Sequence, residues 1–396
     1  MRFGIAHSAL GRLFAALAVL LALGAVVGMA LLWPDGSRNE GPDPRGNAPV
    51  VQRAKVHRVE DLPCTTPQAT DCRRITARLL DGPNKNQDAV LEFGNAGPAP
   101  RVDVGDTIRV VRNEVPEGVP AGSAPPYSFQ DFERRAPMLW LALAFAALVV
   151  VFGRIRGLLS LIGLGISLAV VVVFVLPAIL DGRDPVPVAV AGALAIMVAT
   201  IALAHGVGPK SIAAILGTAA SLALTLGLAE AFTNLAHLTG LSSDESALLI
   251  VGRTDLDLRG LVLAGMVIGA LGVLDDVTVS QASTVMALRR ANPVQRAGEL
   301  YRGALSVGRD HVAATVNTLV LAYVGASLPV LLVFTVGHTP FADAINVEAV
   351  ATQVVATLVG SIGLIAAVPI TTGLAALLAS RLAPDEVGDV DHAHAH

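Results

Sequence analysis

The sequence predicts a polytopic α-helical membrane protein of about eight transmembrane helices, with a small β-rich, OB-like extracytoplasmic domain inserted after the first span. Of its 396 residues, 53% are hydrophobic and only 15% are charged. Several apolar runs reach 18 or more residues, enough to cross a hydrocarbon core of about 30 Å. A series of short alternating stretches between residues 34 and 135 predicts the β-rich insertion.

The chain is expected to have four parts. Residues 1–33 form a cytoplasmic N-terminus and the first span, in which an apolar run from Leu13 to Trp33 follows Arg2 and Arg12. This pattern is typical of a signal anchor, and a cleaved signal peptide is the alternative. Residues 34–135 are the extracytoplasmic domain with its linkers, 136–380 a bundle of about seven transmembrane helices, and 381–396 a cytoplasmic tail.

The extracytoplasmic part contains four clear strand patterns, at residues 50–59, 72–80, 88–94 and 106–113, separated by turn residues. They predict a small curved β-barrel or sandwich, OB-like at best. Nucleic-acid binding is not expected, because the strands lack interleaved aromatic residues. Cys64 and Cys72 are the only cysteines, and two interpretations remain open: a disulfide or two separate thiols.

The segment YSFQDFERR (127–135) leads into the bundle, and its aromatic residues are interpreted as an interfacial belt. Basic residues in short connections predict a bacterial plasma-membrane protein with both termini in the cytoplasm. The basic segment 289–310 is expected either to lie along the inner headgroups or to be a solvated connector. The expected spans of the bundle are 136–152, 158–180, 186–204, 211–234, 260–288, 311–335 and 349–380.

The stretch from Gly265 to Arg290 is the strongest candidate for function. On a helix, Gly265, Gly269 and Gly272 share one face, which predicts close approach of another helix. The same face continues toward the cytoplasm through Asp276, Ser280 and Ser283, with Asp275 beside it. A carboxylate within a span marks a substrate or proton pathway, unless the two aspartates only mark the inner end of a short span.

Three other segments carry polar or small residues. A stripe of Gly217, Ser221 and Thr225 is predicted to pack on the first glycine face. Asn317 and Thr318 lie inside the next-to-last span, where Asn317 is expected to bond Asp276 or a helix backbone. The last apolar run is long enough to break, at Gly360, Gly363 and Pro369, although a simple kink is the alternative.

The membrane segments resemble the YibE/F family of bacterial membrane proteins. The resemblance depends on GRIRG, HGVGPKSIAAILGT, LDLRGLVLAGMVIGALGVLDDVTVSQAS, GRDHVAATVNTLVLAYVGASLP and GSIGLIAAVPITT, in this order, together with YSFQDFERR. It implies architecture rather than a reaction or substrate. Gln353 and Ala356 stand where the family pattern often has an acidic and a basic residue, so an ion pair there is not implied for this chain.

The first functional hypothesis is a transporter or flippase of a lipid or lipid-linked substrate, coupled to protons if Asp275 or Asp276 holds one. The rival is a scaffold or receptor whose outer domain holds a cell-envelope protein partner. An enzyme is not expected, since the sequence contains no HExxH, GxSxG or P-loop motif. No cofactor and no metal site are expected, and the terminal DHAHAH is interpreted as a disordered tail that binds metal weakly at most.

Overall fold

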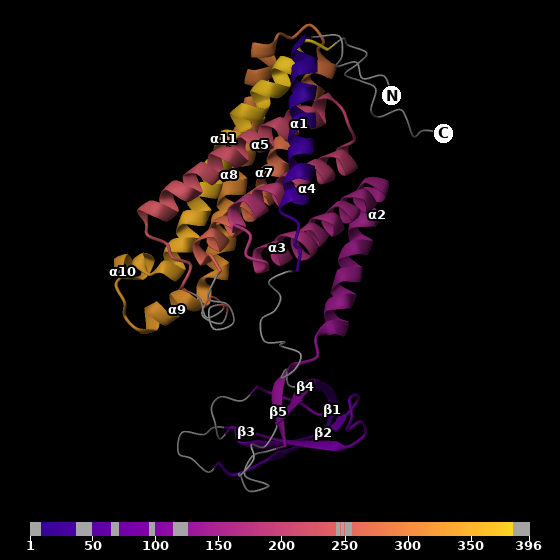
Figure 1. Ribbon diagram of the computed structural model, residues 1–396, viewed down its shortest axis with the longest axis vertical. Helices are drawn as coiled ribbons and strands as arrows, with labels where there is room; N and C mark the ends of the chain where they lie inside the picture. Colours follow the sequence, from indigo (N-terminus) through magenta and orange to yellow (C-terminus); the bar gives the residue numbers. More distant parts are fainter. Residues whose placement is uncertain are drawn as a thin grey trace. The chain divides into compact units, whose positions relative to one another are not determined.

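The computed structural model describes residues 9–36, 50–64, 71–94, 100–113, 126–242, 246, 249 and 256–382. The chain divides into two compact units (Figure 1). One comprises Pro42–Val149, and the other comprises Met1–Gly41 together with Val150–His396. Several long apolar helices and a small antiparallel sheet agree with the predicted polytopic helical membrane protein.

The described part of the β-rich unit contains one antiparallel five-stranded sheet in the order β3-β2-β1-β4-β5. Alternate residues such as Ala54, Val56 and Ile75 are buried on one face, as the period of two requires. The edge strands approach each other, since the rings of Phe93 and Phe129 lie 5.4 Å apart. The sheet therefore curves toward a half-closed barrel. Its strands are β1 (Val51–Asp61), β2 (Arg73–Leu79), β3 (Asp88–Phe93), β4 (Thr107–Arg112) and β5 (Tyr127–Phe132).

The predicted interfacial belt at 127–132 is wrong, because this segment is strand β5 of the sheet. Tyr127 is buried in the β core and accepts a hydrogen bond on its hydroxyl oxygen from Asn84 Nδ2 at 2.8 Å. Phe129 and Phe132 pack edge to face at the rim of the same core. The aromatic side chains of β5 therefore cover one edge of the β core, where β5 approaches β3.

Cys64 and Cys72 are joined by a disulfide, with a Cα–Cα distance of 5.3 Å. Of the residues between them, 65–70 lie outside the described residues, as do most of the two predicted linkers.

The helical unit contains ten α-helices that have assigned bounds in its described residues. A π-helical turn, Val170–Val175, joins α2 to α3. The helices are α1 (Ala9–Leu31), α2 (Arg135–Ala169, which begins in the β-rich unit), α3 (Leu176–Leu180), α4 (Pro185–His205), α5 (Pro209–Leu235), α7 (Leu258–Ala291), α8 (Ala297–Ala326), α9 (Leu328–Val336), α10 (Phe341–Asn346) and α11 (Glu348–Ala379).

Within the described residues, six helices are long and apolar enough to cross a membrane, or seven if the bent pair α8–α9 is one span. The two spans expected at 136–152 and 158–180 fall in one 46-residue helical stretch. Arg154 interrupts the regular helical conformation with a φ of 51°, a backbone angle that residues other than glycine rarely adopt. The bend of 58° between α8 and α9 falls in the middle of the span expected at 311–335.

The segment 289–310 is mostly helix. Helix α8 begins at Ala297, where the Glu299 carboxylate accepts the Arg296 backbone N–H at 2.9 Å. Leu300, Ala304 and Gly308 recur every four residues and are buried against the bundle. Packing of this narrow stripe therefore extends α8 well beyond its apolar stretch.

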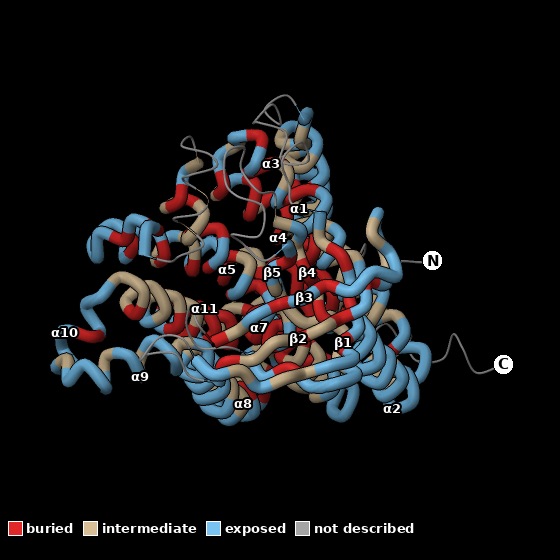
Figure 2. The backbone as a smooth tube through the Cα atoms, turned by 90° about the horizontal axis from the view of Figure 1, so that it is seen from below, coloured by how far each residue is buried: buried red, intermediate tan, exposed pale blue. Residues whose placement is uncertain are grey.

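Helices α5, α7 and α11 run side by side and form the centre of the unit (Figure 1). Their contacts use small side chains: Thr225 of α5 fills the space beside Gly363 of α11, and Thr371 of α11 fills that beside Gly217 of α5. Figure 2 shows buried residues along these helices, whereas α2 and α9 are largely exposed. The core therefore places polar hydroxyls inside a tightly packed three-helix centre.

Candidate functional site

Asp275, near the middle of α7, is half-buried in the helical unit. Its Oδ2 accepts a hydrogen bond from the Thr200 hydroxyl of α4 at 3.2 Å. Its Oδ1 is shielded from solvent and has no hydrogen-bond partner among the described residues. A buried carboxylate oxygen without a donor costs free energy, which protonation relieves. Asp275 therefore lies between α4 and α7 with one oxygen bonded and one oxygen without a donor.

Asp276, which the sequence favoured as the acid at the site, is exposed. Successive residues on a helix point about 100° apart, so both aspartates cannot face the same neighbour. The contacts of α7 with α4 turn Asp275 inward and leave Asp276 on the surface of the bundle. The prediction that Asp276 is the buried carboxylate is thus wrong, and its neighbour Asp275 is the less exposed of the two.

The glycine face of α7 is open rather than packed. Gly265, Gly269 and Gly272 are exposed, and a Cβ added at Gly265 or Gly272 would meet no atom within 4 Å. At Gly269 the nearest atom is the Tyr323 hydroxyl of α8, 3.5 Å from that position. The predicted close helix contact at this face is therefore wrong for the described residues. The face is open at Gly265 and Gly272, and Tyr323 lies against Gly269 between them.

The stripe of α5 packs on α11 and not on the glycine face of α7. The hydroxyls of Ser221 and Thr225 donate to backbone carbonyls one turn earlier on α5, at Gly217 and Ser221, each at 2.8 Å. With their hydrogens bound within the helix, these side chains fill the space opposite the glycines of α11. Gly217, Ser221 and Thr225 thus serve packing in this structure.

Below Asp275, two polar contacts join α7 to its neighbours. The hydroxyls of Thr218 on α5 and Thr278 on α7 lie 2.6 Å apart and are fully buried. One turn further, Gln281 Oε1 accepts from the Thr372 hydroxyl of α11 at 2.9 Å. The Gln281 amide also lies against Gly308 of α8, where a Cβ would approach its Nε2 to 2.7 Å. A buried polar column therefore continues from Asp275 toward the end of α7.

Ser280 and Ser283 are only partly buried, and the Ser283 hydroxyl donates to Val279 O at 2.7 Å. Asn317 and Thr318 of α8 are exposed, and Thr318 donates to Ala314 O at 3.0 Å. No bond from Asn317 to Asp276 occurs among the described residues, so that prediction is wrong. Helix α8 instead packs through an apolar face that includes Val312 and Val316, which turns Asn317 away.

Helix α11 is continuous from Glu348 to Ala379, so the predicted break at Gly360, Gly363 and Pro369 is wrong. A proline removes one backbone hydrogen bond, and tight packing on both sides of α11 holds the helix together in spite of it. The two glycines allow close contacts. Gly363 faces Thr225, and a Cβ added at Gly360 would lie 3.6 Å from a methyl group of Leu319.

Sequence reasoning missed Thr200 entirely and did not place Gln281 and Thr372 at the site. The isolated threonine of α4 lies in an apolar run, VAVAGALAIMVATIALAH, without a polar neighbour to draw attention to it. Thr200 could have been found by asking which side chain donates a hydrogen bond to an aspartate inside a span, because such a carboxylate requires a donor on another helix. The described residues contain no group of three or more His, Cys, Asp or Glu side chains that could hold a metal ion, and the histidine tail lies outside them.

The Asp275–Thr200 contact supports two protonation states. Thr200 Oγ1 lies 2.9 Å from Ile196 O as well as 3.2 Å from Asp275 Oδ2, and its hydroxyl has one hydrogen. When that hydrogen points to Asp275, the carboxylate is bound as an anion. When it points to Ile196 O, Thr200 accepts a hydrogen bond from a protonated Asp275. Rotation of one hydroxyl can thus accompany loading and release of a proton.

Comparison with known proteins gives one family. A family model described as YibE/F-like protein matches residues 141–381, more than half of the chain. No curated protein and no solved structure matches the chain. The matched range includes α4, α5, α7 and α11, and so contains every residue of the buried polar column.

Proposed function

The chain belongs to the YibE/F-like protein family, and from that premise and the half-buried acid of α7 we propose that it is a proton-coupled transporter or flippase of a lipid or lipid-linked substrate. The single observation that carries this proposal is Asp275, a carboxylate with one unpartnered oxygen inside the bundle and one oxygen bonded to Thr200. Ionisable groups within membrane spans are costly, and their usual use is a proton or substrate pathway.

The open face of α7 supports a lipid as the substrate. Gly265 and Gly272 border empty space, and the same face ends in the exposed carboxylate of Asp276. Open space at Gly265 and Gly272 gives room for a headgroup beside the helix, once Tyr323 moves away from Gly269, while its acyl chains stay in the surrounding lipid. A small ion would need an enclosed path, which an open face does not provide.

The test is lipid movement in proteoliposomes that contain the purified full chain and a trace of fluorescent phosphatidylglycerol or fluorescent polyprenyl phosphate. Dithionite added outside destroys the label of the outer leaflet, so the remaining signal measures movement between leaflets. We expect a pH gradient to accelerate this movement for at least one of the two probes. No acceleration for either probe would overturn the proposal.

Two matched substitutions separate the roles of the two aspartates. Asp275→Asn removes the proton-binding carboxylate, and we expect the acceleration by the gradient to fall at least tenfold. Asp276→Asn makes the same change one residue away on the exposed face, and we expect the response to the gradient to persist. Equal effects of the two variants would argue against Asp275 as the proton site.

A second candidate is a scaffold or receptor whose outer domain holds an envelope protein. The observation that favours it is the separate β-rich unit, Pro42–Val149, closed by its own core and by the Cys64–Cys72 bond. Cross-linking in cells followed by purification distinguishes the candidates. A stoichiometric partner bound to this unit, with full cellular function in the Asp275→Asn chain, would favour the scaffold.

The proposal includes a topology of about eight crossings in the bacterial plasma membrane, with both termini in the cytoplasm and an OB-like outer domain. It is supported by the six or seven long apolar helices and by Arg154, which interrupts the longest stretch at the point between two expected spans. Accessibility of single cysteines placed at Arg154 and at Gly182 to an impermeant thiol reagent tests it, in a chain without the native cysteines. The two positions should react from opposite sides of the membrane.

A further inference from the structure

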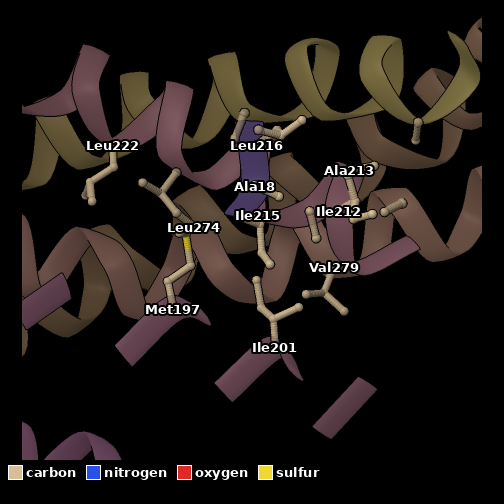
Figure 3. Packing of buried hydrophobic residues seen from close by; sticks show 14 of the residues in the cluster. Ala18, Met197, Ile201, Ile212, Ala213, Ile215, Leu216, Leu222, Leu274 and Val279 are labelled. Carbon is tan, nitrogen blue, oxygen red and sulfur yellow. The ribbon is translucent and has the colours of Figure 1, made fainter. Parts of the chain in front are cut away.

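An apolar groove of about 470 Å³ lies between α1, α4 and α5, away from the Asp275 contact. This volume falls within the range of about 300–1,000 Å³ that small-molecule sites occupy. The groove exists because α1 presents Ala15, Ala18 and Ala22 along one face, and these side chains are too short to reach the opposite wall. Ile215 of α5 belongs to that wall, and Figure 3 shows it beside Ala18.

The walls of the groove favour an apolar occupant. Among the residues that line it, Arg12 and Ser211 alone have polar side chains. The Ser211 hydroxyl already donates to Gly206 O at 2.6 Å, so it does not require a bond from a ligand. An exposed apolar hollow is unfavourable in water, whereas a hydrocarbon chain fills it without loss. Apart from Arg12, the walls offer a polar solute no free partner.

The groove is one leaflet deep and has a cationic end. From Arg12 to Ala22, α1 rises about 15 Å, half of a hydrocarbon core about 30 Å thick. Arg12 is exposed at one end of the groove. Lys210 directly precedes the lining residue Ser211. Positive charge therefore gathers where the headgroup of a lipid in this groove would lie.

We propose that this groove binds one acyl chain of an anionic phospholipid, whose phosphate pairs with the Arg12 guanidinium. A guanidinium donates two parallel hydrogen bonds to a phosphate, and such charge-assisted bonds are stronger than neutral ones. The lipid belongs to the leaflet at the Arg12 end of α1. This site does not depend on transport, because it uses faces of α1, α4 and α5 that take no part in the contact of Asp275.

The test is native mass spectrometry of the full chain released from detergent, with added phosphatidylglycerol. We expect one tightly held lipid in the unchanged protein. Ala22→Phe fills the groove and should lower occupancy at least tenfold. Arg12→Gln should lower affinity for phosphatidylglycerol roughly tenfold, the effect of losing one strong charged contact, and Arg12→Lys should restore part of it.

Two control variants and two control ligands complete the design. Ala16→Phe adds the same bulk at an exposed position of α1 that is not in the lining, and Arg302→Gln removes an exposed charge from α8; both should keep the lipid. Unchanged lipid binding in both Ala22→Phe and Arg12→Gln would overturn the proposal. Equal affinity for phosphatidylcholine, or displacement of the lipid by inorganic phosphate alone, would also contradict it. Thermal unfolding of each variant verifies that it is folded.

Discussion

The Thr200 hydroxyl of α4 lies 3.2 Å from the Asp275 carboxylate of α7, and it is the described hydrogen-bond partner of that side chain. The same hydroxyl lies within bonding distance of Ile196 O on its own helix. A single hydrogen therefore serves two acceptors on two helices. The state of this contact reports whether Asp275 carries a proton, which makes Thr200 the residue through which the proposed coupling is best tested.

Replacing Thr200 with valine should impair proton coupling. Valine has nearly the shape of threonine and lacks the hydroxyl, so Asp275 loses its donor while packing is kept. We expect the acceleration of lipid movement by a pH gradient to fall about tenfold, and stability to fall by about 1–3 kcal/mol, the cost of an unsatisfied buried group. The proteoliposome assay at several gradients and a denaturation curve measure the two effects.

Thr200→Ser is the matched control for this prediction. It keeps the hydroxyl and removes a methyl group, so coupling should return to near the level of the unchanged chain. If valine and serine behave alike, the hydroxyl has no role and the contact is only structural.

Bulk added at the α5–α11 contact should destabilise the bundle. A Cβ at Gly217 would lie 2.1 Å from Thr371 Oγ1, far inside contact distance. We expect Gly217→Ala to cost about 1–3 kcal/mol, the usual range for overpacking a core. Gly272→Ala is the control, since its Cβ meets no atom within 4 Å, and there the higher helix propensity of alanine should stabilise by up to about 1 kcal/mol. Thermal unfolding in detergent compares them, and an equally destabilised Gly272→Ala chain would mean that the glycine face is packed.

The two glycine substitutions show where prediction from the sequence succeeds and where it ends. Periodicity places Gly265, Gly269 and Gly272 on one face correctly, because helix geometry is local. Which neighbour that face meets depends on the rotation of α7, which its contacts with α4, α5 and α11 determine together. The same rotation decides that Asp275 is half-buried and Asp276 exposed. The sequence pattern therefore predicts the candidate functional segment of α7, whereas the packing of α7 against its neighbours determines which aspartate faces α4.

Contacts between segments far apart in the sequence explain the remaining differences between the predicted and the observed structure. The segment 127–132 carries the aromatic pattern of a membrane interface, yet pairing with β4 makes it a strand, and its register from Arg112–Tyr127 to Ile108–Phe132 is set by the partner. Pro369 and the glycines of α11 suggest a broken helix, but the contacts of α5 on one side and α8 on the other keep it whole. The apolar spans themselves need no partner to be recognised.

Loss of the disulfide should loosen the β-rich unit. Cys64 and Cys72 enclose a short loop, eight residues apart in sequence, for which loop entropy gives a stabilisation of about 2–3 kcal/mol. In the Cys64→Ser/Cys72→Ser chain we expect faster amide exchange of β1 and β2, which flank the bond, with little change in α5 and α7. Hydrogen exchange with mass spectrometry resolves the two units. Equal exchange in the variant and the unchanged chain would show that the bond adds no stability.

The β-rich unit should lose part of its stability in acid through Asp81. The Asp81 carboxylate accepts the Arg53 Nε–H at 2.7 Å and the Arg53 backbone N–H at 2.8 Å, and these bonds to Arg53 lower the pKa of Asp81. Because the folded-state pKa lies below that of the unfolded chain, the stabilisation is complete above the unfolded value of about 3.9. It is lost as the pH falls through the folded value. The pair is nearly half exposed, so its contribution is at most about 1 kcal/mol.

We expect Asp81→Asn to speed exchange of the β1 amides at pH 7, after correction for intrinsic rates, and to have no effect at pH 2. Asp103→Asn, at an exposed aspartate of the same unit, should change neither, and an Asp81→Asn effect that persists at pH 2 would mean that the charge of Asp81 is not what stabilises β1.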